Sequence, residues 1–578
     1  MTTSIPEKLK QTLVDLDGKG YKAYKKLQGT SWSYPPFLMK FEHVQGDSFA
    51  FPSRLSITLA TADAGFPEIL FATATRRLAL EDFLLRSFHQ RCARSQFRSR
   101  GSGKSGVITA LVPGQKILKR NAVLIKDDAM RFILFAGLPA DGRKVLGKEC
   151  LQMFAEILPR LWRESLLADS LDAAKIRAHI ATLEDYEALQ GELKKNGWAA
   201  FIGNGSLLPR ASGVSDLPLA KDGVAFIAPE DFTATVSLPH KGNVAGMAIP
   251  DGVTLIVGGG FHGKSALLSA IQSAVYPHIP GDGRETVAAI ESAVKIRAED
   301  GRSARDVDIS SFMDKLPLVN NTASFSTQSA SGSTSQAVNI IEALECETKL
   351  LLMDEDTCAT NFMVRDARMQ ALVHAEKEPV TALIDRIDEI VEKFGASVIM
   401  VMGGSGDYFE SACHIIAMEW FQPKLVTEQA RQIAKAHPTG RRKESKSPFQ
   451  KVSKRRTDPG DLAFSRGRKE TVIQARGVDT LSLGCAEVDA HFIEQLAETG
   501  QLEMCGWILK RLKTLLTKDG ISNFAGLKEV YREIGERGID SLTDYETGLL
   551  ALPRIHEAMA ILNRLRPPPK RSGIEGGQ

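Results

Sequence analysis

The sequence has few cysteines and none at metal-binding spacing. Its 578 residues include seven cysteines, which are scattered singly along the chain. It has no CxxC pair and no close cluster of cysteine and histidine, a pattern that argues against structural zinc. The same scatter favours a reducing compartment, and we therefore expect a cytoplasmic protein.

Long hydrophobic runs are also missing. No stretch approaches eighteen uninterrupted apolar residues, so no membrane-spanning helix is expected. Residues 1–27 have neither an apolar core nor an Arg- and Ser-rich, acid-free pattern, and we predict no targeting segment there. If the chain served a transporter, the membrane part would have to be a separate chain.

A strong overall charge is absent too, since the formal net charge is only +3. Apolar residues make up 43% of the chain and charged residues 25%, which are ordinary values for a globular protein. The length exceeds that of one compact domain and predicts two to four domains.

Four regions differ in pattern. Residues 1–165 mix short β-branched runs with helical stretches, which predicts an N-terminal α+β accessory domain. Residues 166–435 predict an α/β domain, because short apolar strands and helices alternate from residue 224 to about 428, the pattern of a buried parallel sheet. Residues 436–470 are rich in Lys, Arg, Pro and Ser and predict a basic linker. Residues 471–578 predict a C-terminal helical domain with a disordered tail.

One glycine-rich segment, Gly258–Ser265, satisfies GxxxxGK[ST] and lies between a strand-like run and a helical run. Its backbone N–H groups can surround phosphate oxygens, and the following helix N-terminus favours an anion. Lys264 is expected to reach the β- and γ-phosphates and Ser265 to bind Mg²⁺. The predicted ATP contacts are Gly258, Gly259, Gly260, Phe261, His262, Gly263, Lys264, Ser265 and Ala266. Phe226 and Phe232 are the candidates for contact with the adenine.

The apolar strand before Asp354 ends in two carboxylates, Asp354 and Glu355. In P-loop enzymes such an aspartate holds Mg²⁺, usually through water. The adjacent glutamate can orient or deprotonate the attacking water. We therefore predict Asp354 as a metal ligand and Glu355, Asp354 and Lys264 as the catalytic residues.

Between these motifs, the segment Ser329–Gln336 opens a helical run about twenty residues before Asp354. It resembles the signature loop of ABC-class ATPases. That resemblance implies that the loop contacts the γ-phosphate of ATP held by a second copy, through Ser331, Gly332, Ser333 and Gln336. The run after Glu355 resembles the D-loop of the same class, with Asn361 in place of its usual aspartate.

Two features depart from the ABC pattern. Met402–Asp407 lies where a switch histidine is usual, and it contains no histidine. No clear Q-loop glutamine is present, although Asp308–Ser311 lies where one would be expected.

A second glycine loop, Gly101–Ser105, lacks the first glycine of the GxxxxGK[ST] motif and follows basic loop sequence, so we predict that it is not a nucleotide loop.

Further phrases resemble a family of predicted ABC-class ATPases that includes a kinetoplastid mitochondrial ABC ATPase associated with RNA editing. These phrases are His43–Asp47, Pro52–Arg54, Arg100–Gly106, Gly137–Arg143, Asn204–Arg210 and Ala330–Gln336. The resemblance implies an N-terminal accessory domain, a central ABC-type P-loop NTPase core and a C-terminal helical domain. It also implies homodimerisation through the signature loop and binding of RNA.

The basic stretch from Arg86 to Lys104 gives RNA binding independent support. It lacks acidic residues and contains Phe88, His89 and Phe97, so cations and aromatic rings are interleaved in a way that suits phosphate contact and base stacking. A solvated basic face is the alternative interpretation. The predicted RNA contacts are Arg91, Arg94, Arg98, Arg100 and Lys104.

Together these patterns predict an ATP hydrolase that uses ATP and Mg²⁺ at a homodimer interface and couples hydrolysis to RNA binding. An ATP-gated protein-interaction switch with little hydrolysis is the second hypothesis, because the switch histidine is missing. The nucleotide-binding subunit of a transporter is the third hypothesis. The accessory domains weaken it, and so does the short helical subdomain that we expect because only about seventy residues separate Lys264 from Ser331.

Overall fold

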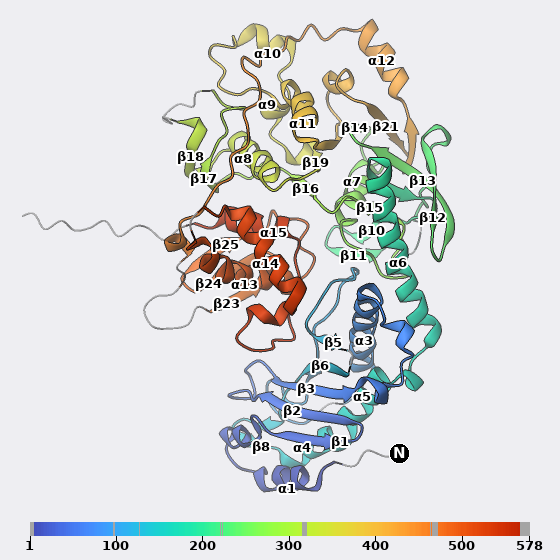
Figure 1. Ribbon diagram of the computed structural model, residues 1–578, viewed down its shortest axis with the longest axis vertical. Helices are drawn as coiled ribbons and strands as arrows, with labels where there is room; N and C mark the ends of the chain where they lie inside the picture. Colours follow the sequence, from blue (N-terminus) through green and yellow to red (C-terminus); the bar gives the residue numbers. More distant parts are fainter. Residues whose placement is uncertain are drawn as a thin grey trace, which may run out of the picture. The chain divides into compact units, whose positions relative to one another are not determined.

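The computed structural model describes residues 5–566, except for residues 96, 98, 127, 220, 222, 315–320, 463, 465–471 and 519. The chain forms two compact units (Figure 1). The first unit comprises Met1–Glu184 together with Ile539–Leu552. The second comprises Asp185–Gly538 and Pro553–Gln578. The long helix α6 (Ala173–Asn196) has residues in both units.

The first unit is built on an antiparallel sheet with the strand order β1-β2-β3-β6-β4, in which β5 also pairs with β6. Its strands are β1 (Ser31–Tyr34), β2 (Phe37–His43), β3 (Ser53–Ala60), β4 (Ile108–Thr109), β5 (Val123–Ile125) and β6 (Ala129–Ala136). Apolar residues alternate along β2, where Phe37, Met39 and Phe41 are buried and Leu38 is exposed. One face of this sheet therefore packs on the core of the unit.

Helices complete the first unit and confirm its predicted α+β class. They are α1 (Glu7–Leu16), α2 (Thr61–Ala64), α3 (Ala74–Arg94), α4 (Gly147–Gln152) and α5 (Leu158–Leu166). The buried carboxylate of Asp82 on α3 accepts hydrogen bonds from Arg86 and Arg120 and contacts the ring of His179. Burial alone would raise the pKa of Asp82, but the two guanidinium groups and His179 hold it far below its usual value.

The segment Ile539–Leu552 belongs to the first unit although it lies near the end of the chain. The Asn121 side-chain amide donates to Asp540 at 2.7 Å and to Thr547 at 3.0 Å. Arg131 also donates to Asp540 at 2.7 Å. A Cβ atom on Gly548 would lie 2.4 Å from Ile133 Cγ2, so only glycine permits this close approach.

The second unit contains the parallel sheet expected from the short apolar runs. Its strand order is β16-β19-β20-β14-β21-β22, and only β22 runs antiparallel to its neighbour. The strands are β14 (Val253–Val257), β16 (Ala293–Ile296), β19 (Leu350–Asp354), β20 (Ser397–Val401), β21 (His414–Glu419) and β22 (Gln422–Leu425). Every residue of β19 and β20 is buried, as is typical of central strands covered on both faces.

A smaller antiparallel sheet has the order β12-β13-β9-β15. Its strands are β9 (Trp198–Gly203), β12 (Thr233–Leu238), β13 (Gly242–Pro250) and β15 (Val287–Ala289). Two hairpins accompany it, β10 (Arg210–Ser212) with β11 (Ser215–Pro218) and β17 (Arg302–Val307) with β18 (Phe325–Ala330). Arg210 donates to the buried Asp282 at 2.7 Å and thereby ties the β10–β11 hairpin to the segment after α7.

The helices of the nucleotide-domain region surround the parallel sheet. They are α7 (Lys264–Ser273), α8 (Gly332–Glu345), α9 (Thr360–Met363), α10 (Ala367–Leu372), α11 (Ile387–Phe394) and α12 (Thr427–Ala436). The described residues of the segment predicted as a basic linker pack against this domain instead of forming a free linker. Phe449 is 5% exposed and packs in the core of this domain, and Arg365 donates to Glu444 at 2.7 Å.

The C-terminal region contains strands as well as the predicted helices. The sheet β23-β24-β25 consists of β23 (Ile473–Arg476), β24 (Thr480–Leu483) and β25 (Ala486–Asp489). The helices are α13 (Thr499–Leu516), α14 (Asn523–Arg537) and α15 (Ile555–Arg564). A Cβ atom on Gly506 would lie 2.5 Å from Ile473 Cγ2, so α13 packs closely on this sheet. Among the described helices, none is both long and apolar enough to cross a bilayer.

Candidate nucleotide-binding site

The glycine-rich segment forms the turn between β14 and α7. Gly258 and Gly263 have φ angles of 137° and 95°, a region that L side chains rarely adopt. A Cβ atom on Gly258 would lie 2.5 Å from the Met418 carbonyl oxygen. The turn therefore needs glycine at both positions, and it places the N-terminus of α7 at the carboxyl end of the sheet.

Lys264 begins α7 and curls back over the turn. Its Nζ donates hydrogen bonds of 2.8 Å to the carbonyl oxygens of Gly258 and Gly259. Ser265 follows in the first turn of α7 and is exposed. An ammonium group and the N–H groups of a helix N-terminus donate hydrogen bonds to phosphate, and a serine hydroxyl oxygen can ligate Mg²⁺, so these residues fit the predicted ligands.

The two residues at the tip of the turn differ in their surroundings. Phe261 has a φ of 63° and is fully exposed. His262 contacts the turn between β21 and β22, where its Nδ1 accepts from the Trp420 N–H at 2.9 Å and its carbonyl oxygen accepts from the Phe421 N–H at 3.0 Å. The β21–β22 turn thus supports the glycine-rich turn from one side.

Asp354 and Glu355 end the neighbouring strand β19. Asp354 is buried, and its Oδ1 accepts from the Asp356 N–H at 3.2 Å. Glu355 Oε2 accepts from the backbone N–H groups of Gly403 at 2.5 Å and Gly404 at 2.9 Å. Two backbone donors therefore hold the Glu355 carboxylate, and both come from the segment where a switch histidine was expected.

Lys264 and Glu355 approach each other at Gly403. A Cβ atom on Gly403 would lie 3.7 Å from Glu355 Oε2 and 4.0 Å from Lys264 Nζ. The ammonium group predicted to bind the phosphates and the carboxylate predicted to act on the attacking water thus lie on the same side of Gly403. Sequence reasoning missed Gly403 and Gly404 as partners of Glu355, although two glycines directly after an apolar strand were visible in the sequence.

The predicted signature loop lies between β18 and α8. Ser331 is the extended residue before α8, and its Oγ lies 3.0 Å from Thr334 Oγ1. Ser333 donates to Asn361 Oδ1 at 2.7 Å, which joins the predicted signature loop to the predicted D-loop in one chain. Ser331 and Asn361 are exposed. The loop therefore presents hydroxyl groups and a helix N-terminus to its surroundings.

Gln336 differs from its predicted role as a nucleotide contact. Its side chain is fully buried, its Oε1 accepts from the Ala359 N–H at 2.8 Å, and its Nε2 lies 3.2 Å from Met363 Sδ. Both polar atoms are therefore used within the chain. Gln336 holds the segment after Glu355 against α8 instead of facing a ligand.

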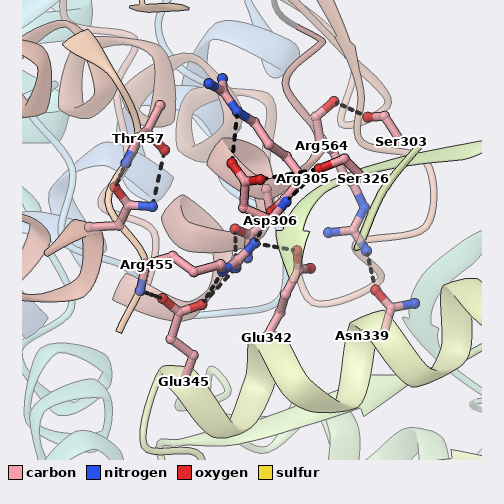
Figure 2. A network of polar contacts seen from close by, with 12 residues as sticks. Ser303, Arg305, Asp306, Ser326, Asn339, Glu342, Glu345, Arg455, Thr457 and Arg564 are labelled. Atoms are coloured by element: carbon pink, nitrogen blue, oxygen red, sulfur yellow. Dashed lines mark hydrogen bonds and ion pairs between the residues drawn. The ribbon is translucent and has the colours of Figure 1, made fainter. Parts of the chain in front are cut away.

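A buried polar network anchors α8 to the C-terminal region (Figure 2). Arg455 donates to Glu345 at 2.7 Å, to Glu342 at 3.2 Å and to Asn563 at 2.8 Å. Arg564 of α15 donates to Glu299 at 3.1 Å. Burial raises the pKa of Glu345 above its usual value despite the ion pair with Arg455. Residues of the predicted linker and C-terminal domain thus fix the helix that carries the signature loop.

The predicted RNA contacts lie in the first unit and have unequal surroundings. Arg91 contacts Glu164 at 3.4 Å and donates to the Ser170 carbonyl oxygen at 3.0 Å. Arg94 at the end of α3 and Arg100 are exposed. Lys104 Nζ lies 5.4 Å from the centre of the Phe51 ring. Arg98 lies outside the described residues.

The second glycine loop is a structural loop. The Lys104 N–H donates to the Ser48 carbonyl oxygen at 2.7 Å, and Ser105 Oγ accepts from the Ala140 N–H at 3.0 Å. A Cβ atom on Gly103 would lie 2.4 Å from the Ser48 carbonyl oxygen. Its glycines allow close packing of segments near residues 48, 103 and 140, so two of the phrases behind the family resemblance, Arg100–Gly106 and Gly137–Arg143, pack together here.

Exposed aromatic rings lie beside this loop, and sequence reasoning missed them. Phe49 is 68% exposed, and Phe51 and Tyr545 are 53% and 54% exposed. The Arg54 guanidinium carbon lies 4.6 Å from the centre of the Tyr545 ring. We call Phe49, Phe51, Arg54, Lys104 and Tyr545 the aromatic–cation patch. The spacing of Phe49, Phe51 and Arg54 was the available signal, but Tyr545 is distant in sequence.

Three family models match consecutive parts of the chain. The model described as ATPase of the ABC class N-terminal matches residues 6–169. A P-loop ABC ATPase domain model matches residues 172–455, and a model described as the MRB1590 C-terminal domain matches residues 472–568. The three models occur in the order that the resemblance implied.

The chain is also similar to individual proteins over part of its length. The chain is similar to the uncharacterized protein MJ1628 of Methanocaldococcus jannaschii, with 30% identity over 38% of this chain and 49% of that protein. The chain therefore spans about half the length of this curated relative. Among solved structures, CbiO1 of Clostridium perfringens, part of the ABC transporter complex CbiONQ, gives a TM-score of 0.26 at 14% identity over 42% of this chain and 96% of that one. The ADP conformation of MJ1267, an ATP-binding cassette of an ABC transporter, gives 0.25 at 12% identity over the same shares.

Proposed function

Because the chain belongs to the ABC-class ATPase family that includes the kinetoplastid RNA-editing-associated ABC ATPase, we propose that it hydrolyses ATP at two sites formed between two copies of the chain. We further propose that RNA binding is coupled to this association. The observation that supports the first proposal is that Lys264 and Glu355 both lie next to Gly403. An ammonium group, a carboxylate and a helix N-terminus converge there at the carboxyl end of a parallel sheet, where ligands of α/β domains bind.

Each residue of the site has a distinct task in this proposal. The N–H groups of the Gly258–Ser265 turn surround the β-phosphate, and Lys264 leaves its carbonyl partners to bind the β- and γ-phosphates. Ser265 and Asp354 would hold Mg²⁺, which would neutralise charge on the phosphate oxygens when bound. Glu355 orients the attacking water and accepts its proton. The amides of Gly403 and Gly404 keep that carboxylate in place.

The exposed signature loop supports the two-copy arrangement. Ser331, Gly332 and Ser333 form the N-terminus of α8, whose dipole and hydroxyl groups favour an anion. The buried network around Arg455 holds α8 rigidly in the chain. In our proposal, the loop of one copy closes over the γ-phosphate bound by the Lys264 of the other copy. Asn361, bonded to Ser333, takes the place of the D-loop aspartate beside it.

The aromatic–cation patch and the exposed arginines support RNA as the second ligand. Exposed rings can stack on unpaired bases, and neighbouring cations can contact phosphates. Phe49 and Phe51 provide the rings, and Arg94 and Arg100 are exposed cations of the same unit. Arg86 and Arg120 are excluded from this role because both are committed to Asp82.

The hydrolysis proposal is tested by Glu355→Gln. The amide keeps the shape of the side chain but cannot accept the proton, so turnover should fall about 10²- to 10⁴-fold. The Kd for ATP should stay unchanged, and the variant should accumulate as a dimer with ATP in sedimentation experiments. Normal turnover in Glu355→Gln would contradict the assigned chemistry.

The RNA proposal is tested by the salt dependence of binding to single-stranded RNA. Charge reversal at Arg94, Arg98 and Arg100 should weaken binding and reduce the slope of log K against log salt, because phosphate contacts release counterions. Phe49→Ala combined with Phe51→Ala should weaken binding without changing that slope. ATPase activity without RNA should be preserved in both variants. Undiminished binding in both would show that the RNA binds elsewhere on the chain and would contradict this proposed surface.

An ATP-gated protein-interaction switch with little hydrolysis is the second candidate. The observation that favours it is the segment Gly403–Asp407, which contains no histidine and whose glycine amides hold Glu355. Steady-state turnover measured with and without RNA separates the two candidates. RNA should stimulate a coupled ATPase, whereas a switch should show slow turnover that RNA does not change.

A further inference from the structure

The turn between β21 and β22 is unusual in its residues and conformation. Glu419 pairs with Gln422, so Trp420 and Phe421 alone form the turn. Their φ angles are 49° and 66°. Two-residue turns of this kind normally use asparagine and glycine, because bulky side chains are strained at positive φ. Such strain persists where the surroundings impose it, and it is common at ligand sites.

The backbone of this turn and the Phe421 side chain support the glycine-rich turn. Both backbone N–H groups donate to His262, as described above. A Cβ atom on Gly263 would lie 2.6 Å from Phe421 Cδ1, so the Phe421 ring lies directly against Gly263. These contacts explain the strained backbone and the aromatic ring at position 421. They do not use the indole ring of Trp420.

The Trp420 side chain is left largely exposed at the edge of the nucleotide site. It is 72% exposed, and its ring contacts the His262 ring with a centroid distance of 4.9 Å and an interplanar angle of 48°. A large apolar ring is thus held beside a residue of the phosphate-binding turn. Its position is set by the turn backbone, so little ordering is needed for it to receive a ligand.

The order of the strands defines which end of the nucleotide reaches Trp420. In the parallel sheet, β20 and then β19 lie on one side of β14, and β21 lies on the other. Glu355 and Gly403 follow β19 and β20, so the γ-phosphate must lie on their side. A triphosphate that runs along the turn after β14 therefore directs its nucleoside towards the end of β21. Neighbouring strands are about 4.8 Å apart, which is within reach of a nucleoside.

We propose that Trp420 stacks on the base of the bound nucleotide. This inference rests on the proposed ATP site and names the residue that recognises the base. The two phenylalanines that were candidates for adenine contact lie in less suitable positions for stacking on the base. Phe226 is 1% exposed, and the Phe232 ring packs on His414 at the opposite end of β21.

Calorimetric titration of the full chain with ATP and with inorganic tripolyphosphate, both with Mg²⁺, tests the proposal. Stacking of a base on an aromatic ring is strong enough that Trp420→Ala should weaken ATP binding about tenfold or more. Tripolyphosphate has no base, so its affinity should not change. Trp420→Phe should restore most of the ATP affinity. Trp32→Ala, which removes a partly exposed tryptophan of the other unit, serves as the control and should bind both ligands normally.

The outcomes separate the inference from the proposed function. Unchanged ATP affinity in Trp420→Ala would overturn base stacking while leaving the ATP site intact. An equal loss for ATP and tripolyphosphate would also overturn it, because Trp420 would then act only through the phosphate-binding turn. Failure of the unaltered protein to bind either ligand would overturn the nucleotide site itself, and base stacking with it.

Discussion

The carboxylate of Glu355 is held by the backbone N–H group of Gly403 across two neighbouring strands of the parallel sheet, at 2.5 Å. The N–H group of Gly404 adds a second bond of 2.9 Å. Two such bonds limit the rotation of the carboxylate. The segment after β20 therefore holds the carboxylate that we predict to be the general base, and this contact requires no histidine.

Gly404→Ala should lower turnover by displacing Glu355. A Cβ atom at this position would lie 2.8 Å from Glu355 Oε1, closer than ordinary contacts allow, so the carboxylate must shift. A misplaced general base costs about 10²-fold in kcat. The Kd for ATP should change little, since the phosphate-binding turn is untouched.

Gly403→Ala is the matched control for this prediction. Its Cβ atom would lie 3.7 Å from Glu355 Oε2, which is an ordinary contact. Its kcat should stay within a few-fold of that of the unaltered protein, as judged by steady-state phosphate release. Equal kcat values for the two variants would show that the position of Glu355 does not limit turnover.

Two inactive variants should restore activity when they are mixed. Lys264→Ala removes the phosphate-binding ammonium group, and Ser331→Glu places a negative charge at the exposed signature loop. If each site combines Lys264 of one copy with Ser331 of the other, a mixed dimer keeps one intact site. Random pairing would then recover about a quarter of the normal turnover. A mixture that stays inactive, although the variants exchange partners in fluorescence experiments, would contradict sites shared between copies.

Arg455→Met should destabilise the second unit. The change leaves the buried carboxylate of Glu345 without its ion-pair partner, and loss of one partner of a buried pair costs about 3–5 kcal/mol. The free energy of unfolding from denaturant titration measures the effect. Lys454→Met removes a neighbouring exposed cation and should stay within about 0.5 kcal/mol. An equally small change for Arg455→Met would mean that the network does not stabilise α8.

The first unit should lose stability as the pH rises towards 8 because of Glu81. Burial raises the pKa of Glu81 to about 7 in the folded chain, although the Ile125 N–H donates to it at 2.7 Å. A folded pKa above the unfolded value gives a contribution that is complete below about pH 4.5 and is lost through pH 7. Glu81→Gln should therefore exceed the unaltered protein in stability by about 1–3 kcal/mol at pH 8 and not at pH 4. A difference that does not depend on pH would contradict this assignment.

The local motifs of the site were predictable because each is contiguous. Gly258–Ser265 encodes a strand, a turn that needs glycine and a helix start within one short segment. The apolar strand before Asp354 and Glu355 was equally clear, since every residue of β19 is buried. The polar role of Gln336 was not predictable, because its burial depends on α9 and not on its own neighbours.

The sequence by itself determined the class of the chain, the phosphate-binding turn and the positions of the two carboxylates, because these depend on local conformation and local polarity. Only the tertiary structure decided that the amides of Gly403 and Gly404 hold Glu355 and that Trp420 lies beside His262. It also decided that Ile539–Leu552 joins the first unit. The physical reason is that neighbouring strands of a parallel sheet are distant in sequence, and their order follows from the packing of the whole domain.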